Sequence, residues 1–268
     1  MTSTLNSELM HLNQWFTANR LSLNISKTHA MLFTLNNHLS SQTLDLRIHQ
    51  TPIDTVTHSK FLGIHIDNKL TWSRHISHIC NKVSKSIGIL TKVSKFLNKA
   101  TRRMLYNCFV LPYLRYGNII WGRAASIHIT RLFILQKRAI RIISGAEFLA
   151  HTNPLFHDHH TLKLQELNTY LCALFVYKIY HNMFPTSFST PFQITPSVHP
   201  HLTRAISSNT AIVPYCRTSL RQKSFAIIAP KIFNSNLCRN DYIINTHSFS
   251  HFKKVIADQL IGSYNHLE

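Results

Sequence analysis

The chain has 268 residues, of which 44% are hydrophobic, an ordinary share for a globular protein that buries a core. Its 29 Lys and Arg residues outweigh 10 Asp and Glu residues, for a net charge of +19 and a pI near 10.1. This composition argues against wholesale disorder. The charge favours a polyanionic partner, with nucleic acid first and an anionic membrane surface second.

The cysteines are odd in number, widely spaced and never arranged as CxxC, which argues against a disulfide scaffold and a cysteine zinc finger. They are Cys80, Cys108, Cys172, Cys216 and Cys238. The first residues lack the apolar core of a signal peptide, and no apolar run approaches membrane-spanning length. We therefore expect a soluble intracellular protein, nuclear or cytoplasmic, with no membrane partner.

The first 70 residues predict a helix followed by a small antiparallel sheet. An amphipathic helix is expected over residues 4–18, with Leu5, Leu9, Leu12 and Phe16 on one face. Alternating apolar residues then predict strands at 29–35 and 44–49, and a third strand at 61–67. Asp45, Asp54 and Asp67 stand at strand ends or hairpins, where an exposed polar residue is ordinary.

From residue 72 onward the apolar residues follow a helical period. Helices are expected at 72–97, 99–111, 126–143, 161–182 and 248–262. Residues 115–122 read as a short apolar link, 185–217 as an extended Pro-, Ser- and Thr-rich loop, and 224–234 as an ordered piece that is either strand or helix. The predicted fold class is α+β, a small palm-like sheet region followed by a mainly helical remainder.

Positive charge is concentrated in the predicted helices, because no acidic residue occurs between Asp67 and Glu147. A solvated helix face normally mixes signs, so a merely soluble surface is the weaker interpretation. A membrane-surface role is weaker too, since the basic helices lack an opposite face rich in Trp and Phe. The candidate nucleic-acid-binding residues are Lys82, Lys85, Lys92, Lys95, Arg102, Arg103, Lys137, Arg138 and Arg141.

Motifs for other chemistry are absent or weak. No two acidic residues are adjacent or two apart, as the paired carboxylates of a two-metal site would be, and no glycine-rich phosphate loop or GxSxG motif occurs. His157, His159 and His160 cluster around Asp158, and His199 lies near His201, without HExxH spacing. Solvated loop histidines are the favoured interpretation, with adventitious metal binding as the alternative.

Several motifs, in order, resemble the reverse transcriptases of non-LTR (LINE-type) retrotransposons. The stretch WFTANRLSLNISKT matches a W-x-x-x-N-x-L-x-L-N-x-x-K-T run, and FLGIHIDNKLTWSRHI matches F-L-G-I-x-I-D-x-x-L-x-W-x-x-H-I. YGNIIWG resembles a thumb-side Y-G-x-x-x-W-G motif, LQKRAIRII resembles a helical L-Q-x-x-A-x-R-x-I motif, and SFAIIAPKIFN resembles a C-terminal segment in which Phe233 replaces the commoner Trp. The resemblance covers nearly the whole chain.

The resemblance implies a partial palm at residues 1–70, a helical thumb at 71–145 and a C-terminal helical region at 146–268. Phe61, Leu62, Gly63 and Ile64 would then belong to a primer grip, although ordinary strand core explains the three apolar residues equally well. Lys27 matches a lysine proposed as a proton donor in the family, and a simple cation near a helix end is an equal alternative.

The family's catalytic aspartate pair would precede the first helix, and no pair in this chain can replace it. We therefore expect no catalytic residue and no cofactor in the chain alone, with Mg²⁺ implied only for the complete family enzyme. The expected partners are RNA, DNA or an RNA–DNA hybrid, and an upstream polymerase portion. Three interpretations stay open: an inactive fragment, an enzyme only with upstream sequence, or a host-recruited binding or scaffold protein without a polymerase role.

Overall fold

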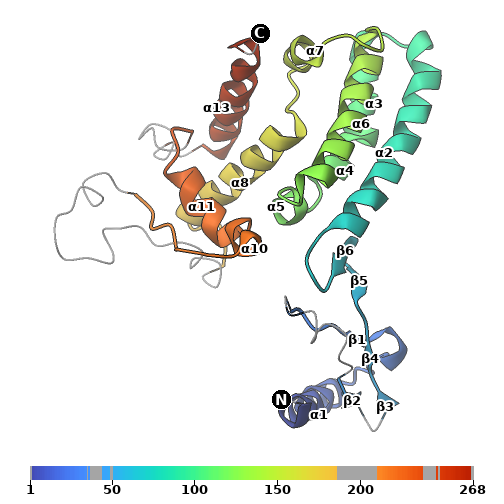
Figure 1. Ribbon diagram of the computed structural model, residues 1–268, viewed down its shortest axis with the longest axis vertical. Coiled ribbons are helices and arrows are strands. Elements are labelled where there is room, and N and C mark those ends of the chain that lie inside the picture. Colours follow the sequence, from blue (N-terminus) through green and yellow to red (C-terminus); the bar gives the residue numbers. More distant parts are fainter. Residues whose placement is uncertain are drawn as a thin grey trace, which may run out of the picture. The chain divides into compact units, whose positions relative to one another are not determined.

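A computed structural model describes residues 2–34, 36, 44–48, 51–185, 210–237, 246 and 248–266. The chain divides into two compact units, Met1–His75 and Ile76–Glu268 (Figure 1). The first contains one helix and short strands, and the second is helical, which confirms the α+β fold class. The predicted boundary at residue 145 lies inside the second unit. The assignment of palm, thumb and C-terminal region therefore stays a prediction.

The first unit begins with helix α1, Thr2–Ala18, as the apolar period predicted. A single 3₁₀ turn, η1, covers Ile25–Lys27. Among the described residues of this unit, the strands are β1 (His29–Ala30), β2 (Arg47–Ile48), β3 (Thr51–Pro52), β4 (Asp54–Thr55), β5 (His58–Phe61) and β6 (Ile64–Asp67). Pairs β2–β3 and β5–β6 are antiparallel as expected, whereas β1 and β4 pair in parallel. The strands predicted at 29–35 and 44–49 are much shorter than their alternating patterns.

The first unit has a small core, so its apolar residues are only partly covered. Leu46, Ile48 and Ile53 are buried, and Leu9 of α1 packs against them. The side chain of Asn6 fixes α1 to the start of β2. Its Nδ2 donates to the Asp45 carbonyl and its Oδ1 accepts from the Arg47 amide, both at 3.0 Å. On the rest of the apolar face of α1, Leu5 and Leu12 are exposed and Phe16 is half-buried.

The strand predicted at 61–67 is interrupted by a tight turn. Residues Leu62 and Gly63 connect β5 to β6 and both have positive φ, at 46° and 82°. Positive φ at both central residues is the backbone of a type I′ hairpin, which suits the twist of antiparallel strands. Glycine adopts this conformation without cost, whereas leucine is strained in it. The FLGI motif is therefore a hairpin turn.

The second unit is built from helices whose positions follow the predicted apolar periods closely. In chain order these are α2 (Ser73–Val93, which starts at the end of the first unit), η2 (Ser94–Phe96), α3 (Lys99–Phe109), α4 (Leu111–Arg115), α5 (Asn118–Trp121), α6 (Ser126–Ser144), α7 (Thr152–Asp158), α8 (Leu164–Tyr180), α10 (Ser219–Gln222), α11 (Phe225–Phe233), α13 (Phe249–Gly262) and η5 (Ser263–His266). The expected apolar link contains α5, and the undecided segment at 224–234 is helix α11.

Local sequence explains where these helices begin and end. The Asn98 side chain accepts from the Thr101 amide at 2.8 Å and caps α3. Pro112 lies in the first turn of α4, where its missing N–H costs nothing. Helix α6 ends at Gly145, which has a φ of 69°, the left-handed conformation of a common C-terminal cap.

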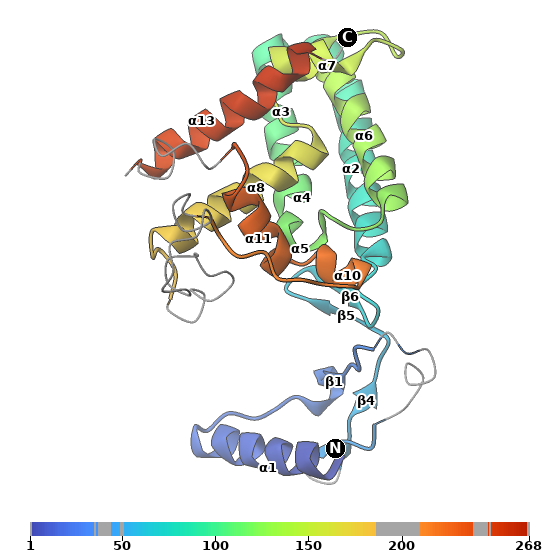
Figure 2. The same cartoon turned by 60° about the vertical axis from the view of Figure 1, so that its left-hand side comes forward.

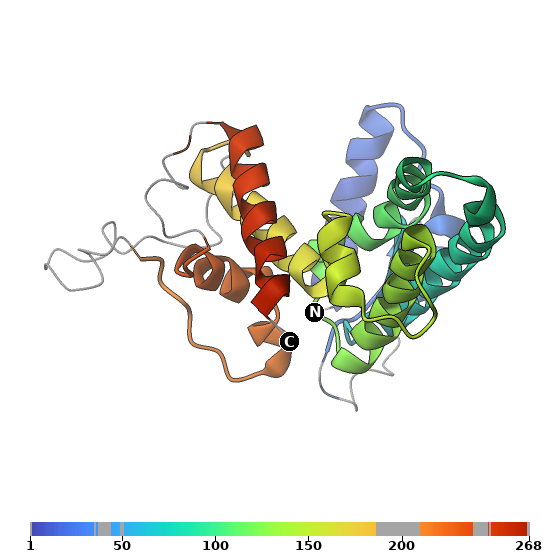
Figure 3. The same ribbon diagram turned by 90° about the horizontal axis from the view of Figure 1, so that it is seen from above.

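Within the second unit the helices form two groups. Helices α2, α3 and α6 run beside one another in Figures 1 and 2, and Figure 3 shows α8, α11 and α13 gathered apart from them. Side chains of α8, α11 and α13 share one apolar core that includes Tyr177, Ile228 and Ile256. Helix α8 also contacts α4, α5 and α6, so it joins the groups.

The loop predicted at 185–217 lies mostly outside the described residues. Its last part, 210–217, is irregular, and the backbone of Ala211 exchanges two 2.8 Å hydrogen bonds with the side chain of Asn234. Among the described residues, no helix has the length and apolar character needed to cross a membrane.

Candidate nucleic-acid interface

Helix α2 presents a basic face opposite a buried one. Lys82, Lys85 and Lys92 are exposed, whereas Val83 and Leu90 between them are buried at 0% and 1% exposure. At 3.6 residues per turn the three lysines fall on one side of the helix, and they extend along roughly 15 Å of its axis. Lys95, in η2, is exposed as well. The predicted lysine face therefore points to solvent.

No carboxylate neutralises these lysines within the part of the chain that the structure describes. The salt bridges found there are Arg47–Asp45, Lys99–Asp158 and His160–Asp258. None involves Lys82, Lys85, Lys92 or Lys95. An unpaired ammonium group costs nothing in desolvation while it is exposed, and it remains available to a phosphate.

The predicted basic residues of α3 and α6 fall into two groups. Arg103 and Arg138 are exposed, like the lysines of α2. Lys137 lies over the Phe133 ring at 4.6 Å, and the Arg141 Nε donates to the Ala150 carbonyl at 2.8 Å. Arg102 is half-buried and packs against Gly145, where an added Cβ would lie 3.1 Å from its Nη1.

These contacts give Arg102, Lys137 and Arg141 a role in packing. Arg141 closes the connection between α6 and α7, and Arg102 joins α3 to the end of α6. Their charges still add to the field of the surface. The residues best placed for direct phosphate contact are the exposed ones, namely the four lysines of α2 and η2 with Arg103 and Arg138.

The primer-grip-like hairpin has an exposed apolar tip. Phe61 and Leu62 are 63% and 73% exposed, whereas Ile64 is buried. The interpretation of these residues as ordinary strand core is correct for Ile64 and wrong for Phe61 and Leu62, because Phe61 ends β5 with its side chain exposed and Leu62 lies in the turn. Lys27 is exposed at the end of η1, and its family role stays untested.

Asp67 of the same motif has a structural role, as its position at a strand end predicted. Its Oδ1 accepts from the amides of Lys69 and Thr71 at 3.2 and 2.9 Å, and its Oδ2 accepts from the Trp72 amide at 3.0 Å. These bonds hold a tight turn in which Leu70 and Trp72 have positive φ. Within the described residues, no three His, Cys, Asp or Glu side chains are grouped to hold a metal ion.

The histidine cluster is less exposed than the sequence suggested. His159 is buried, and its Nε2 lies 2.9 Å from the Ser144 Oγ, so the interpretation as a solvated loop histidine is wrong for this residue. Burial, with Lys99 and Arg103 nearby, lowers its pKa from the ordinary 6.5. His160 pairs with Asp258 at 3.0 Å. His199 and His201 lie outside the described residues.

The described cysteines are free thiols, in agreement with the prediction of no disulfide scaffold. Cys80 and Cys172 are buried, and burial raises the pKa of Cys172 to about 11. Such a thiol stays protonated near neutral pH and is a poor nucleophile. Cys238 lies outside the described residues.

Comparison with known proteins finds similarity to RNA-directed DNA polymerases of transposable elements. The chain is 30% identical over 150 residues to the probable RNA-directed DNA polymerase from transposon X-element of Drosophila melanogaster, over 54% of this chain. It is 35% identical over 109 residues to the RNA-directed DNA polymerase from mobile element jockey of the same species, over 39% of the chain. A third relative, from transposon BS, is 28% identical over 166 residues.

The chain is thus related to non-LTR retrotransposon reverse transcriptases. The matched part makes up 16%, 12% and 18% of these relatives, so the similarity covers less than a fifth of the length of each. No model of a protein family matches the chain. No solved structure matches it either.

Several residues that the chain shares with the reverse transcriptase motifs hold its helices together. Trp121 is fully buried, and its Nε1 donates to the Tyr116 carbonyl at 2.9 Å. Gln136, also fully buried, donates to the Tyr106 hydroxyl at 3.1 Å and the Leu162 carbonyl at 2.9 Å. Trp121 of the YGNIIWG motif and Gln136 of the LQKRAIRII motif therefore serve in the packing of the helices.

A buried pair of asparagines in the second unit was not predicted from the sequence. Asn118 and Asn168 are buried at 1% and 3% exposure, and the Asn168 Oδ1 accepts from the Arg123 Nε at 3.0 Å. The two asparagines lie 50 residues apart, and no single-sequence pattern indicates that they pair. The available signal was Gly122, since a close approach to both asparagines requires a residue without a Cβ.

Proposed function

We propose that the chain binds the phosphate backbone of an RNA–DNA hybrid through the basic face of α2 and η2, supported by Arg103 and Arg138. The observation that carries the proposal is the unpaired, exposed lysine row opposite a fully buried helix face. A-form and hybrid duplexes are met through shape and backbone contacts, so weak sequence preference is expected. The relationship to RNA-directed DNA polymerases supports a template–primer as the partner.

The test is the salt dependence of binding to a hybrid duplex, measured by fluorescence anisotropy. If about six phosphates are neutralised, log affinity should fall with log salt at a slope of roughly −4 to −5. Removing three contacts with Lys82→Gln, Lys85→Gln and Lys92→Gln together should make the slope shallower by about 2 to 3.

A matched variant controls for the loss of three positive charges. Arg217→Gln, Lys223→Gln and Lys254→Gln remove the same charge from exposed positions of the second unit outside the proposed face. This variant should change the slope by less than about 1. Equal slopes in the two variants, or a flat salt response in the unmodified chain, would contradict the proposal.

We also propose that the chain alone does not extend a primer, because its ten acidic residues include no closely spaced pair for two metal ions. Incubation with a hybrid template–primer, Mg²⁺ and nucleotides should leave the primer length unchanged. The alternative, a host-recruited binding or scaffold protein, makes the same prediction for extension. Restored extension on addition of an upstream polymerase portion would favour the reverse transcriptase fragment.

A further inference from the structure

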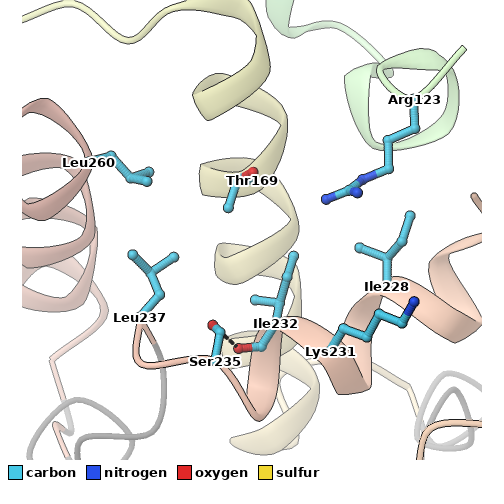
Figure 4. Close-up of a pocket in the computed structure, with 8 residues that line it drawn as sticks. All are labelled: Arg123, Thr169, Ile228, Lys231, Ile232, Ser235, Leu237 and Leu260. Atoms are coloured by element: carbon cyan, nitrogen blue, oxygen red, sulfur yellow. Dashed lines mark hydrogen bonds between the residues drawn. The ribbon is translucent and has the colours of Figure 1, made fainter. Parts of the chain in front are cut away.

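The second unit contains a cavity of about 290 Å³ whose two ends differ in chemistry. Leu237 and Leu260 lie at one side, and Arg123, Lys231 and Ile228 at the other, with Ile232 of α11 between the two sides (Figure 4). Thr169 of α8 also lines it. The cavity therefore offers an apolar space with two cations at its edge.

Arg123 is held in place by a chain of buried amides. The Asn118 Nδ2 donates to the Leu114 carbonyl at 2.9 Å, and the Asn168 Nδ2 donates to the Asn118 Oδ1 at the same distance. The Asn168 Oδ1 then accepts from the Arg123 Nε at 3.0 Å. Because both asparagines are buried, this chain fixes the guanidinium of an otherwise exposed side chain.

The fixed guanidinium is suited to an anion. Its Nε is used by Asn168, which leaves the outer edge with Nη1 and Nη2, the edge that binds phosphate with two parallel hydrogen bonds. Neither Arg123 nor Lys231 takes part in a salt bridge among the residues that the structure describes. Two unpaired cations beside an apolar space match a ligand with one anionic group and one flat, largely apolar part.

We propose that Arg123 and Lys231 bind the phosphate of one unpaired nucleotide whose base and sugar enter this cavity. This inference rests on the proposed nucleic-acid function and adds a second site for single-stranded RNA or DNA. A base must leave its stack to enter a pocket between helices, which costs least in a single strand. The hybrid face of α2 needs no such step.

The experiment compares binding of an unpaired 12-nucleotide RNA and a 12-base-pair hybrid to three variants. Arg123→Gln removes the phosphate fork. Thr169→Met fills the cavity without changing charge, on a helix that tolerates Met better than Thr. Lys223→Gln is the control, because it removes an exposed positive charge at the end of α10, outside both the cavity and the proposed face of α2.

Arg123→Gln and Thr169→Met should each weaken single-strand binding by about tenfold and hybrid binding by less than about twofold. Lys223→Gln should weaken both by a similar small factor. If the cavity variants behave like Lys223→Gln, the pocket is not a nucleotide site, although the hybrid proposal stands. If single-strand binding depends on Arg123 and Thr169 while hybrid binding lacks salt dependence, the cavity is a nucleotide site and the proposed hybrid-binding face is wrong.

Two outcomes would overturn the inference in other ways. Binding of neither nucleic acid by the unmodified chain would overturn it together with the proposed function. A glutamate-rich peptide that binds with the same sensitivity to Arg123→Gln and Thr169→Met would show that the cavity takes an acidic peptide instead. Circular dichroism of each variant verifies that the helices remain folded.

Discussion

His159 shows how a polar side chain from a histidine-rich segment becomes part of the interior. It packs at the end of α7 against Ser144, near Lys99 and Arg103 of α3. Burial and these cations both oppose protonation, so the folded chain favours the neutral ring. A buried neutral histidine links folding to pH, because the unfolded chain accepts a proton more readily.

The stability contributed by neutral His159 is present above its ordinary pKa of 6.5 and is lost as pH falls below it. His159→Gln keeps a group able to bond Ser144 and cannot titrate in this range. We expect the free energy of unfolding to fall less in the variant than in the unmodified chain between about pH 7.5 and 5.5. The difference is at most about 1.4 kcal/mol per pH unit, measured by denaturant titration at each pH. Identical pH dependence in the two proteins would rule out this linkage.

At the level of elements, helical periodicity was informative and strand alternation was not. Helices α2, α6 and α8 lie within a few residues of their predicted ranges, since α2 and α6 each bury one apolar stripe and α8 is apolar and buried on several sides. The strands are short because few neighbours exist in the first unit to extend a ladder, and β1 pairs with β4, 25 residues away. Such pairing depends on the whole unit and cannot be deduced from local alternation.

The candidate nucleic-acid interface was likewise predictable only in part. Exposure of the α2 lysines follows from the period that buries Val83 and Leu90, so that part needed no structure. The partial burial of Arg102, the bond from Arg141 to Ala150 and the Arg123 relay depend on contacts between helices. A single sequence contains no record of those contacts.

The corner between α5 and α6 depends on Gly122, the last residue of the YGNIIWG motif. A Cβ at Gly122 would lie 2.5 Å from the Asn118 carbonyl and from the Asn168 Nδ2. Gly122→Ala should therefore push α5 from α8 and destabilise the fold by about 1–3 kcal/mol. Chemical denaturation measures this loss.

Gly88→Ala is the matched control for Gly122→Ala. An added Cβ at Gly88 meets nothing within 4 Å on the exposed side of α2, and alanine favours helix over glycine. This change should stabilise the chain by about 0.5–1 kcal/mol. A similar effect of the two substitutions would mean that the close approach of α5 and α8 is not required.

On the scale of the whole molecule, the dominant feature is a net charge of +19, and most of the basic residues that the structure describes take part in no salt bridge. Like charges within a Debye length of about 10 Å at 0.1 M salt repel one another and oppose the compact state. A polyanion would relieve this repulsion on binding. The same row of lysines that is proposed to bind phosphate is therefore expected to lower the stability of the free protein.

Salt should consequently stabilise the unbound chain. Raising NaCl from about 20 to 300 mM should increase stability by about 1 kcal/mol, which corresponds to a rise in Tm of about 2–4 °C for a chain of this size. The triple variant Lys82→Gln, Lys85→Gln, Lys92→Gln should have the higher Tm at low salt and gain less from added salt, because less repulsion remains to be screened. Thermal melts followed by far-UV circular dichroism test both expectations on the helical signal. A Tm that is independent of salt, or an equal gain in the variant, would show that these lysines are too far from other charges to strain the fold, and the proposed binding face would then have no stability cost.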